Sequence, residues 1–307
     1  MTTTDEAVLL IAFNRPDHLT VLIDRLRQVQ PARVYLAVDG PRPERPDEAD
    51  KVLACQALAA EIDWPCEVST LFREQNLGCG LGVSSAISWF FEHEERGIIL
   101  EDDIIPDPTF FPFCAELLDR YQDDMRVFAI SGCNYVPPEG LSTTGAYRFA
   151  QVPHIWGWAT WRRSWDEYQL DIAGWRKRLP IHKLWARSGK RLAATVFWTG
   201  TFELLARKQV DTWDGQLVLA SMSANQWTAT SNVNLVENLG FGIDATHTVD
   251  EVDTLEVKPI ALPTNPVPVE LDRRADAWAR RHHFRMSVIG MLHQLYRFAR
   301  LRRGSST

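Results

Sequence analysis

Three consecutive carboxylates, Glu101, Asp102 and Asp103, end a short apolar run within residues 97–106. The run at residues 98–100 follows a glycine and predicts a strand that is buried on both faces. Adjacent carboxylates at the end of a buried strand repel one another unless a cation or hydrogen-bond donors neutralise them. A divalent metal ion is the simplest neutraliser, and a solvated strand end paired with arginines is the alternative. Because a buried strand precedes the acids and a proline follows, the functional interpretation is favoured.

The acids suggest separate roles. Alternation along a strand sends Glu101 and Asp103 to one side and Asp102 to the other, so metal binding and hydroxyl binding could be divided between them.

Downstream, Asp214 follows a tryptophan, and an apolar wall can raise the basicity of a carboxylate. His247 lies in a glycine-flanked loop. A lone histidine there is more often an ordinary surface or core residue than a ligand.

Residues 147–230 are rich in tryptophan. Trp156 and Trp158 flank Gly157 in the densest part of this segment. Their rings could stack on the faces of sugars or pack in the core, and the two interpretations carry equal weight. The glycine suits a close approach of the backbone to a neighbour better than it suits a helix.

Alternating strand and helix signals position these residues. Apolar strands are predicted at residues 8–13, 34–38, 66–72, 98–100 and 127–130. Helical patterns lie between them. This order predicts an α/β fold with a doubly wound, Rossmann-like, mostly parallel sheet flanked by helices. Ligands of such sheets bind at the carboxyl ends of the strands, so we expect Asp39, which ends the second strand, to share one crevice with the acidic triplet.

The composition limits the classes of function. A chain of 307 residues with 45% hydrophobic content is long enough for a folded core. The net charge of −7 and the pI near 5.7 argue against a nucleic-acid binder. Five cysteines without paired metal-ligand spacing predict reduced thiols in a cytoplasmic protein. No cleavable signal peptide or run of about 20 apolar residues is found, so no membrane span is expected.

Three glycines, Gly78, Gly80 and Gly82, follow a predicted strand and open a helix. A dinucleotide fingerprint would need a glycine at position 83, which is a valine, so NAD binding is disfavoured. Close approach of a ligand or a neighbouring helix and simple packing at the helix start remain the alternatives.

Taken together, the chain resembles a GT-A glycosyltransferase over roughly residues 7–250, and within that fold the inverting N-acetylglucosaminyltransferase I family and its bacterial relatives. The motifs that carry the resemblance are Phe13-Asn14-Arg15-Pro16, Val38-Asp39-Gly40, Asn76-Leu77-Gly78, Glu101-Asp102-Asp103, Trp156-Gly157-Trp158 and Trp213-Asp214. Two features depart from the family. Gly215 replaces a bulkier or acidic residue, and the membrane anchor and stem of Golgi members have no counterpart in the sequence.

The resemblance implies roles for individual residues. Asp103 would hold a manganese (or magnesium) ion, and His247 would lie near the metal or the diphosphate. Asp214 would be the catalytic base, and Trp156 and Trp158 would contact the acceptor. The implied donor-binding residues are Arg15, Asp39, Asn76, Glu101 and Asp102. Of these, Asp102 and Asp39 would contact the nucleoside, and Arg15 would contact the diphosphate.

The expected activity is a metal-dependent, inverting transfer of a sugar from a nucleotide-diphosphate donor, with a UDP-sugar favoured. The acceptor would be a hydroxyl on a glycan, a lipid-linked glycan or a small molecule. A cation on Asp103, helped by Arg15, would stabilise the leaving diphosphate, and Asp214 would take the proton of the acceptor. One alternative is a non-catalytic saccharide-binding protein. Another is a sugar-phosphate nucleotidyltransferase, which should carry a glycine-rich basic loop where residues 14–16 stand.

The sequence predicts three segments. Residues 1–250 form the GT-A domain, divided into a nucleotide-sugar-binding half (1–135) and an acceptor-binding half (136–250). A proline-containing linker (251–270) and a basic, amphipathic helical tail (271–307) follow. Such a tail can lie on an anionic bilayer at the cytoplasmic face. Packing on the domain or on a second subunit of a homodimer is the alternative, and it is slightly favoured.

Overall fold

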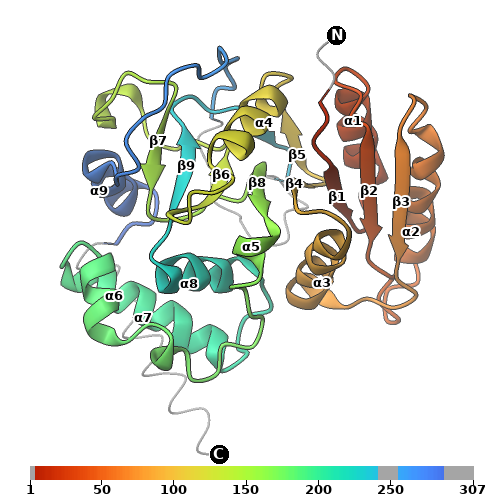
Figure 1. The fold of residues 1–307 in the computed structure, drawn as a ribbon. Helices are drawn as coiled ribbons and strands as arrows, with labels where there is room; N and C mark the ends of the chain where they lie inside the picture. The colour runs from red at the N-terminus through yellow and green to blue at the C-terminus, as the bar shows by residue number, and fades with distance from the viewer. Residues whose placement is uncertain (1–3, 241–254, 287–307) are drawn as a thin grey trace, which may run out of the picture.

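A mostly parallel sheet forms the centre of the protein, as the sequence predicts (Figure 1). The computed structural model describes residues 4–240 and 255–286. The eight strands stand in the order β3-β2-β1-β4-β8-β6-β9-β7, and β8 and β7 run opposite to the other six. The strands are β1 (Val8–Ala12), β2 (Arg33–Val38), β3 (Glu67–Phe72), β4 (Arg96–Glu101), β6 (Val127–Ser131), β7 (Tyr147–Ala150), β8 (Trp158–Trp161) and β9 (Trp227–Ser231).

Helices cover both faces of the sheet. α1 (Pro16–Leu26) and α4 (Phe110–Arg120) pack on one face, and α3 (Gly78–His93) and α8 (Asp214–Ala224) pack on the other. The remaining helices in the described part are α2 (Glu48–Ala57), α5 (Arg162–Trp165), α6 (Ile181–Arg187), α7 (Leu192–Ala206) and α9 (Arg273–His282).

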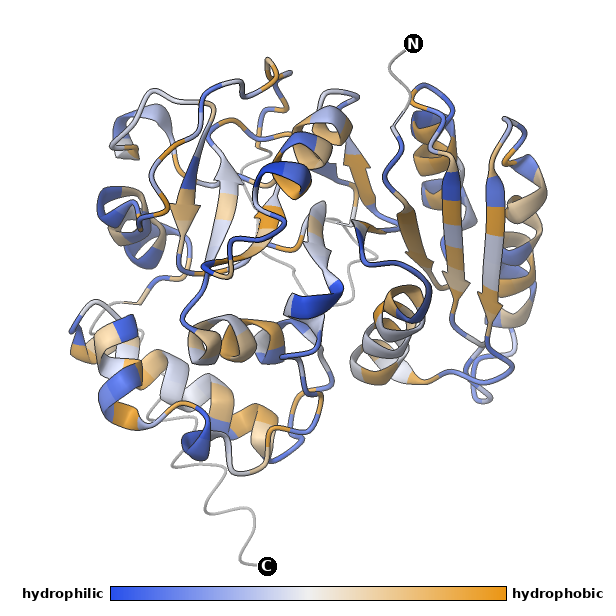
Figure 2. Cartoon of the chain, in the orientation of Figure 1, coloured by the Kyte–Doolittle hydropathy of each residue, from blue (hydrophilic) through white to orange (hydrophobic). Residues whose placement is uncertain are grey.

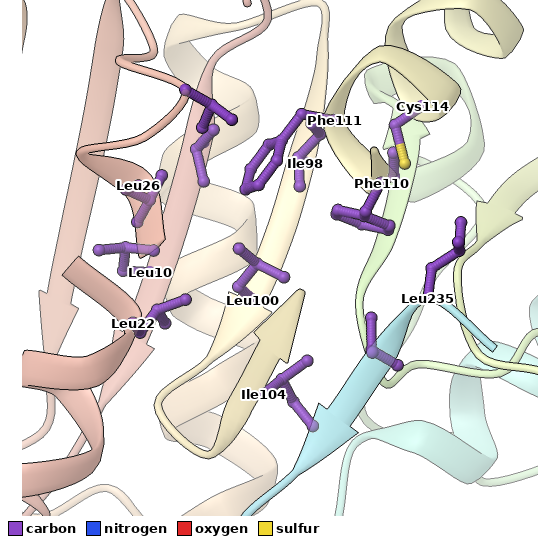
Figure 3. Close-up of a cluster of buried hydrophobic side chains, with 14 of the residues drawn as sticks. Leu10, Leu22, Leu26, Ile98, Leu100, Ile104, Phe110, Phe111, Cys114 and Leu235 are labelled. Carbon is purple, nitrogen blue, oxygen red and sulfur yellow. The ribbon is translucent and has the colours of Figure 1, made fainter. Parts of the chain in front are cut away.

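Side-chain alternation along β1 explains the layers. Leu10 joins the cluster on the side of α1, whereas Leu9 joins the cluster on the side of α3. Figure 3 shows Leu22 and Leu26 of α1 close to Leu10. Figure 2 shows β1 as apolar along its length. A central strand of a doubly covered sheet contacts apolar neighbours on both faces. It therefore needs apolar residues at every position, as the sequence of β1 provides.

The order of connections creates a switch point beside β1. β2 and β3 follow β1 in the sequence and lie on one side of it in the sheet. The next strand, β4, pairs with β1 on its other side. β4 ends at Glu101, and a turn leads into β5 (Ile104–Pro106), which pairs with β10 (Val236–Asn238). The acidic triplet therefore lies at the carboxyl end of a strand next to the switch point.

The segment after residue 255 packs on the sheet. The backbone N–H of Lys258 bonds to the carbonyl of Asn234, and that of Val267 bonds to the Tyr147 hydroxyl. α9 buries Ala275 and Ala279 against the body of the protein, so this part of the tail follows the packing alternative. The rest of the tail lies outside the described residues. Within the described part, every helix is too short or too polar to cross a membrane.

Candidate active site

An open cavity of about 630 Å³ lies at the switch point. The carboxyl ends of β1, β2 and β4 and the start of α3 surround it. Its size lies within the range of small-ligand pockets. Six of the predicted donor and metal residues line it together: Arg15, Asp39, Asn76, Glu101, Asp102 and Asp103.

Arg15 connects the acids. Its Nη1 lies 3.0 Å from Asp103 Oδ2 and 3.8 Å from Asp102 Oδ1. The backbone N–H of Phe13 donates to Asp102 Oδ2 at 3.3 Å. The prediction that alternation separates Asp102 from Asp103 is wrong, because the strand ends at Glu101 and the next two residues form a turn that brings both acids to one arginine.

Arg15 does not neutralise the acidic triplet completely. Burial, with the charge of Asp103 beside it, raises the pKa of Asp102 to about 7, although Arg15 acts in the opposite direction. Burial also raises the pKa of Glu101, and the charges of Asp103, Asp102 and Asp214 add to the increase. Among the described residues, Glu101 and Asp102 therefore hold a proton more readily than free carboxylates do, and a bound cation would relieve the same repulsion.

Asp39 fastens the end of β2 to the start of α3. Its carboxylate accepts hydrogen bonds from the backbone N–H groups of Gly40 (2.9 Å) and Leu77 (3.1 Å). Asn76 Nδ2 donates to Asp39 Oδ2 and to the carbonyl of Gly40, and Asn76 Oδ1 accepts from Gly78. Asn76 thus holds Asp39 in place. Burial raises the pKa of Asp39, while its backbone hydrogen bonds oppose the increase.

The glycines at the start of α3 make room for two carboxylates. A Cβ on Gly78 or Gly80 would lie 2.5 or 2.6 Å from the carboxylate of Asp211, and one on Gly82 would lie 3.0 Å from that of Asp39. The close neighbours of this motif are therefore the carboxylates of Asp211 and Asp39, which both lie outside helices, and not a neighbouring helix. Asp211 lines the cavity and was missed in the sequence, where its position three residues before Asp214 was the available signal.

Asp214 begins α8 beside the crevice. Its Oδ1 accepts hydrogen bonds from Thr212 Oγ1 (2.5 Å) and from the backbone N–H of Gly215 (2.8 Å). The sequence predicts an apolar wall around the carboxylate of Asp214, but the described residues do not form one. Asp214 is exposed, because Trp213 turns into the core and stacks on Trp158 with ring centroids 5.8 Å apart.

The two tryptophans of the Trp-Gly-Trp motif separate. Trp156 lines the cavity. Trp158 is 1% exposed and belongs to the core, which contradicts a role in stacking on an acceptor. Gly157 causes the separation with its φ of +62°, and a Cβ there would lie 2.5 Å from Val236 Cγ1. This confirms the predicted close approach at Gly157. His247 lies outside the described residues.

Oxygen atoms gather at Gly240, where a Cβ would collide with Asp103 Oδ2 and come within 2.9 Å of Asn238 Oδ1. Among the described residues, no three His, Cys, Asp or Glu side chains converge as a complete metal site. Mg²⁺ and similar hard cations use one or two carboxylates together with water and substrate phosphates. The oxygen atoms of Asp103 and Asn238 therefore fit a cation that is also bound by the phosphates of a ligand better than a cation that is held by protein side chains alone.

Comparisons with known proteins leave the family open. No protein-family model matches the chain, and no curated protein matches it. Among solved structures, HddC from Yersinia pseudotuberculosis is 11% identical over 53% of this chain and 80% of its own, with a TM-score of 0.34. The glycosyltransferase GlyE of Streptococcus pneumoniae TIGR4 is 10% identical over 75% and 46%, with a TM-score of 0.35. A UDP-glucose pyrophosphorylase complexed with UDP-glucose is 11% identical over 78% and 94%, with a TM-score of 0.38.

Proposed function

We propose that this protein is a metal-dependent glycosyltransferase. It moves a sugar, with inversion, from a nucleoside-diphosphate sugar, a UDP-sugar being favoured, to a hydroxyl of a glycan, a lipid-linked glycan or a small molecule. The observation that carries the proposal is the incompletely neutralised acidic triplet at the mouth of a switch-point crevice, with Arg15 between Asp102 and Asp103. A partly buried cluster of carboxylates of this kind is suited to a cation that bridges protein carboxylates and phosphates.

The crevice offers complementary surfaces for such a donor. Arg15 and a cation on Asp103 would hold the diphosphate, and the nucleoside would lie beside Asp39, where the apolar side chains of Leu71 and Val83 line the wall. Glu101 would help to retain the cation. Manganese or magnesium, when bound, would act as a Lewis acid on the leaving diphosphate. His247 stays a candidate ligand on the resemblance alone.

Acceptor activation is assigned to Asp214. Its carboxylate is exposed beside the crevice, and its charge acts on Glu101, which lines the crevice. A positioned carboxylate that takes the proton of the acceptor hydroxyl contributes about 10²- to 10⁴-fold to the rate. The hydroxyl of Thr212 would orient Asp214, and Trp156 would form the wall on which the acceptor lies.

The decisive test is product analysis with a panel of UDP-sugars and simple sugar acceptors, with and without manganese. We expect free UDP and a glycosylated product only when manganese is present. Binding that raises the melting temperature without UDP release would instead favour the saccharide-binding alternative. Pyrophosphate released from a nucleoside triphosphate and a sugar 1-phosphate would identify a nucleotidyltransferase, and either of these results would overturn the proposal.

Peripheral membrane contact through the basic tail belongs to the same proposal, since it would bring the enzyme to lipid-linked acceptors. The sequence after Met286 holds four arginines. Ending the chain after Met286 keeps α9, which packs on the body of the protein. Flotation with anionic vesicles should then separate the full chain, which binds, from the shortened chain, which does not. Equal flotation of the two chains would contradict a membrane role for this segment.

A further inference from the structure

A second cavity, of about 710 Å³, shares no lining residue with the crevice. It lies between α6, the carboxyl end of α8, the start of β9 and the segment that enters α9. Figure 1 shows these helices on the side of the molecule away from β1, β2 and β3. Along α8, nine residues or roughly 14 Å separate Asp214 from Ser223 of the second cavity.

Gln151 is an unexplained polar group in this cavity. Gln151 is among the residues that line the cavity, it is 3% exposed, and its buried Nε2 and Oε1 have no hydrogen-bond partner in the described part of the chain. The backbone N–H of Gln151 bonds to Asp276 Oδ1, so the residue is held while its amide stays unpaired. An unpaired buried polar group costs about 1–3 kcal/mol. A ligand with a hydroxyl group would satisfy both amide atoms, because a hydroxyl can donate and accept.

Three cations surround the same cavity: Lys183, Arg187 and Arg273. The Arg187 guanidinium lies 5.1 Å from the ring centroid of Trp227, which also lines the cavity. Within the described residues, none of the three cations has a carboxylate within 4 Å, and Glu270 is the acid among the lining residues. The excess of positive charge suits an anionic group.

We infer that the second cavity binds a small molecule that combines hydroxyl groups with an anionic group, as a phosphorylated or acidic sugar does. The hydroxyl pairs with the amide of Gln151, and the anionic group lies between Lys183 and Arg187. The inference does not depend on the activity assigned to the crevice, because the two cavities use different residues.

The test measures binding of inorganic phosphate, glucose, glucuronate and glucose 6-phosphate to the full chain by calorimetry. We expect glucose 6-phosphate or glucuronate to bind more tightly than phosphate or glucose alone. Lys183→Gln should weaken that binding about tenfold, as expected for loss of a charge-assisted hydrogen bond. Lys208→Gln removes the same charge from an exposed lysine outside both cavities and should leave binding unchanged.

Gln151→Leu provides the sharper signature. The variant removes an unpaired buried amide, so the ligand-free protein should melt at a higher temperature while the affinity for the sugar anion falls about tenfold. Absence of binding by the whole panel at millimolar concentrations would overturn the inference. So would equal affinity in the parent, Lys183→Gln and Gln151→Leu proteins. Loss of UDP binding together with sugar-anion binding in Lys183→Gln would also overturn it, because the anion would then occupy the crevice.

Discussion

The carboxylate of Asp211 accepts a 2.9 Å hydrogen bond from the backbone N–H of Gly80, although 131 residues separate the two in the chain. A second bond of 3.0 Å comes from the N–H of Cys79. The first turn of a helix has N–H groups without intrahelical partners, and a carboxylate is favoured there by the helix dipole. The loop before α8 therefore caps α3 and joins the two predicted halves of the domain at the rim of the crevice.

We expect Asp211→Ala to lower the free energy of unfolding by about 1 kcal/mol, the usual value of a helix cap. Urea unfolding measures the loss. Asp123→Ala, at an exposed acid, serves as the control and should change stability by less than about 0.5 kcal/mol. Equal stability of the two variants would show that the cap contributes nothing.

Asp103→Asn tests the metal site. The affinity for UDP should lose its manganese-dependent part, with a decrease of about tenfold or more, because metal affinity depends strongly on its ligands. Stability should change little, since the pair with Arg15 is partly exposed and the variant also removes repulsion within the triplet. Calorimetric titration of UDP with and without manganese makes the measurement. Unchanged manganese-dependent affinity would exclude Asp103 as the ligand.

Asp214→Asn tests the catalytic base. The variant keeps the shape of the side chain but cannot accept a proton, so turnover should fall by about two orders of magnitude or more. UDP affinity should stay nearly constant because the base acts in the transition state. Turnover and melting temperature are measured on one preparation. A variant that stays active but melts earlier would show that Asp214 only stabilises the start of α8.

Gly157→Ala should destabilise the protein through both its backbone and its neighbours. Gly174→Ala is a matched control, because Gly174 has a φ of +75° but no atom lies within 4 Å of the position that its Cβ would take. The control should cost about 1–2 kcal/mol, the usual penalty of a left-handed conformation. Gly157→Ala should cost more, since its Cβ would collide with Val236. Equal losses in urea unfolding would mean that Val236 moves away freely.

His154 should make stability depend on pH. Burial, together with the nearby His283 and Arg148, holds the pKa of His154 well below its ordinary value of 6.5. In the window between the two pKa values the unfolded chain binds more protons than the folded one, so stability is fully present above about pH 6.5 and falls as the pH is lowered through it. From about pH 8 to about pH 5, the melting temperature of His154→Phe should decline less steeply than that of the parent protein. Parallel curves would assign the decline to other groups.

Local sequence patterns were sufficient to predict the parallel core and the crevice. Continuous apolar strands such as residues 98–100 have one stable environment, the interior of a sheet covered on both faces. Parallel strands connected by helices bring their carboxyl ends to one edge, so the sequence alone predicts that Asp39 and the acids at the end of β4 lie together.

Local patterns could not decide which aromatic rings and which acids face that crevice. Trp156 and Trp158 are two residues apart, yet the left-handed turn at Gly157 sends one to the cavity and the other to the core. Asp211 becomes a partner of Gly80 only through the packing of the α8 loop against α3. The second cavity likewise draws its residues from separate segments. Contacts between residues far apart in the chain depend on how whole elements pack, and no periodicity within one element encodes them.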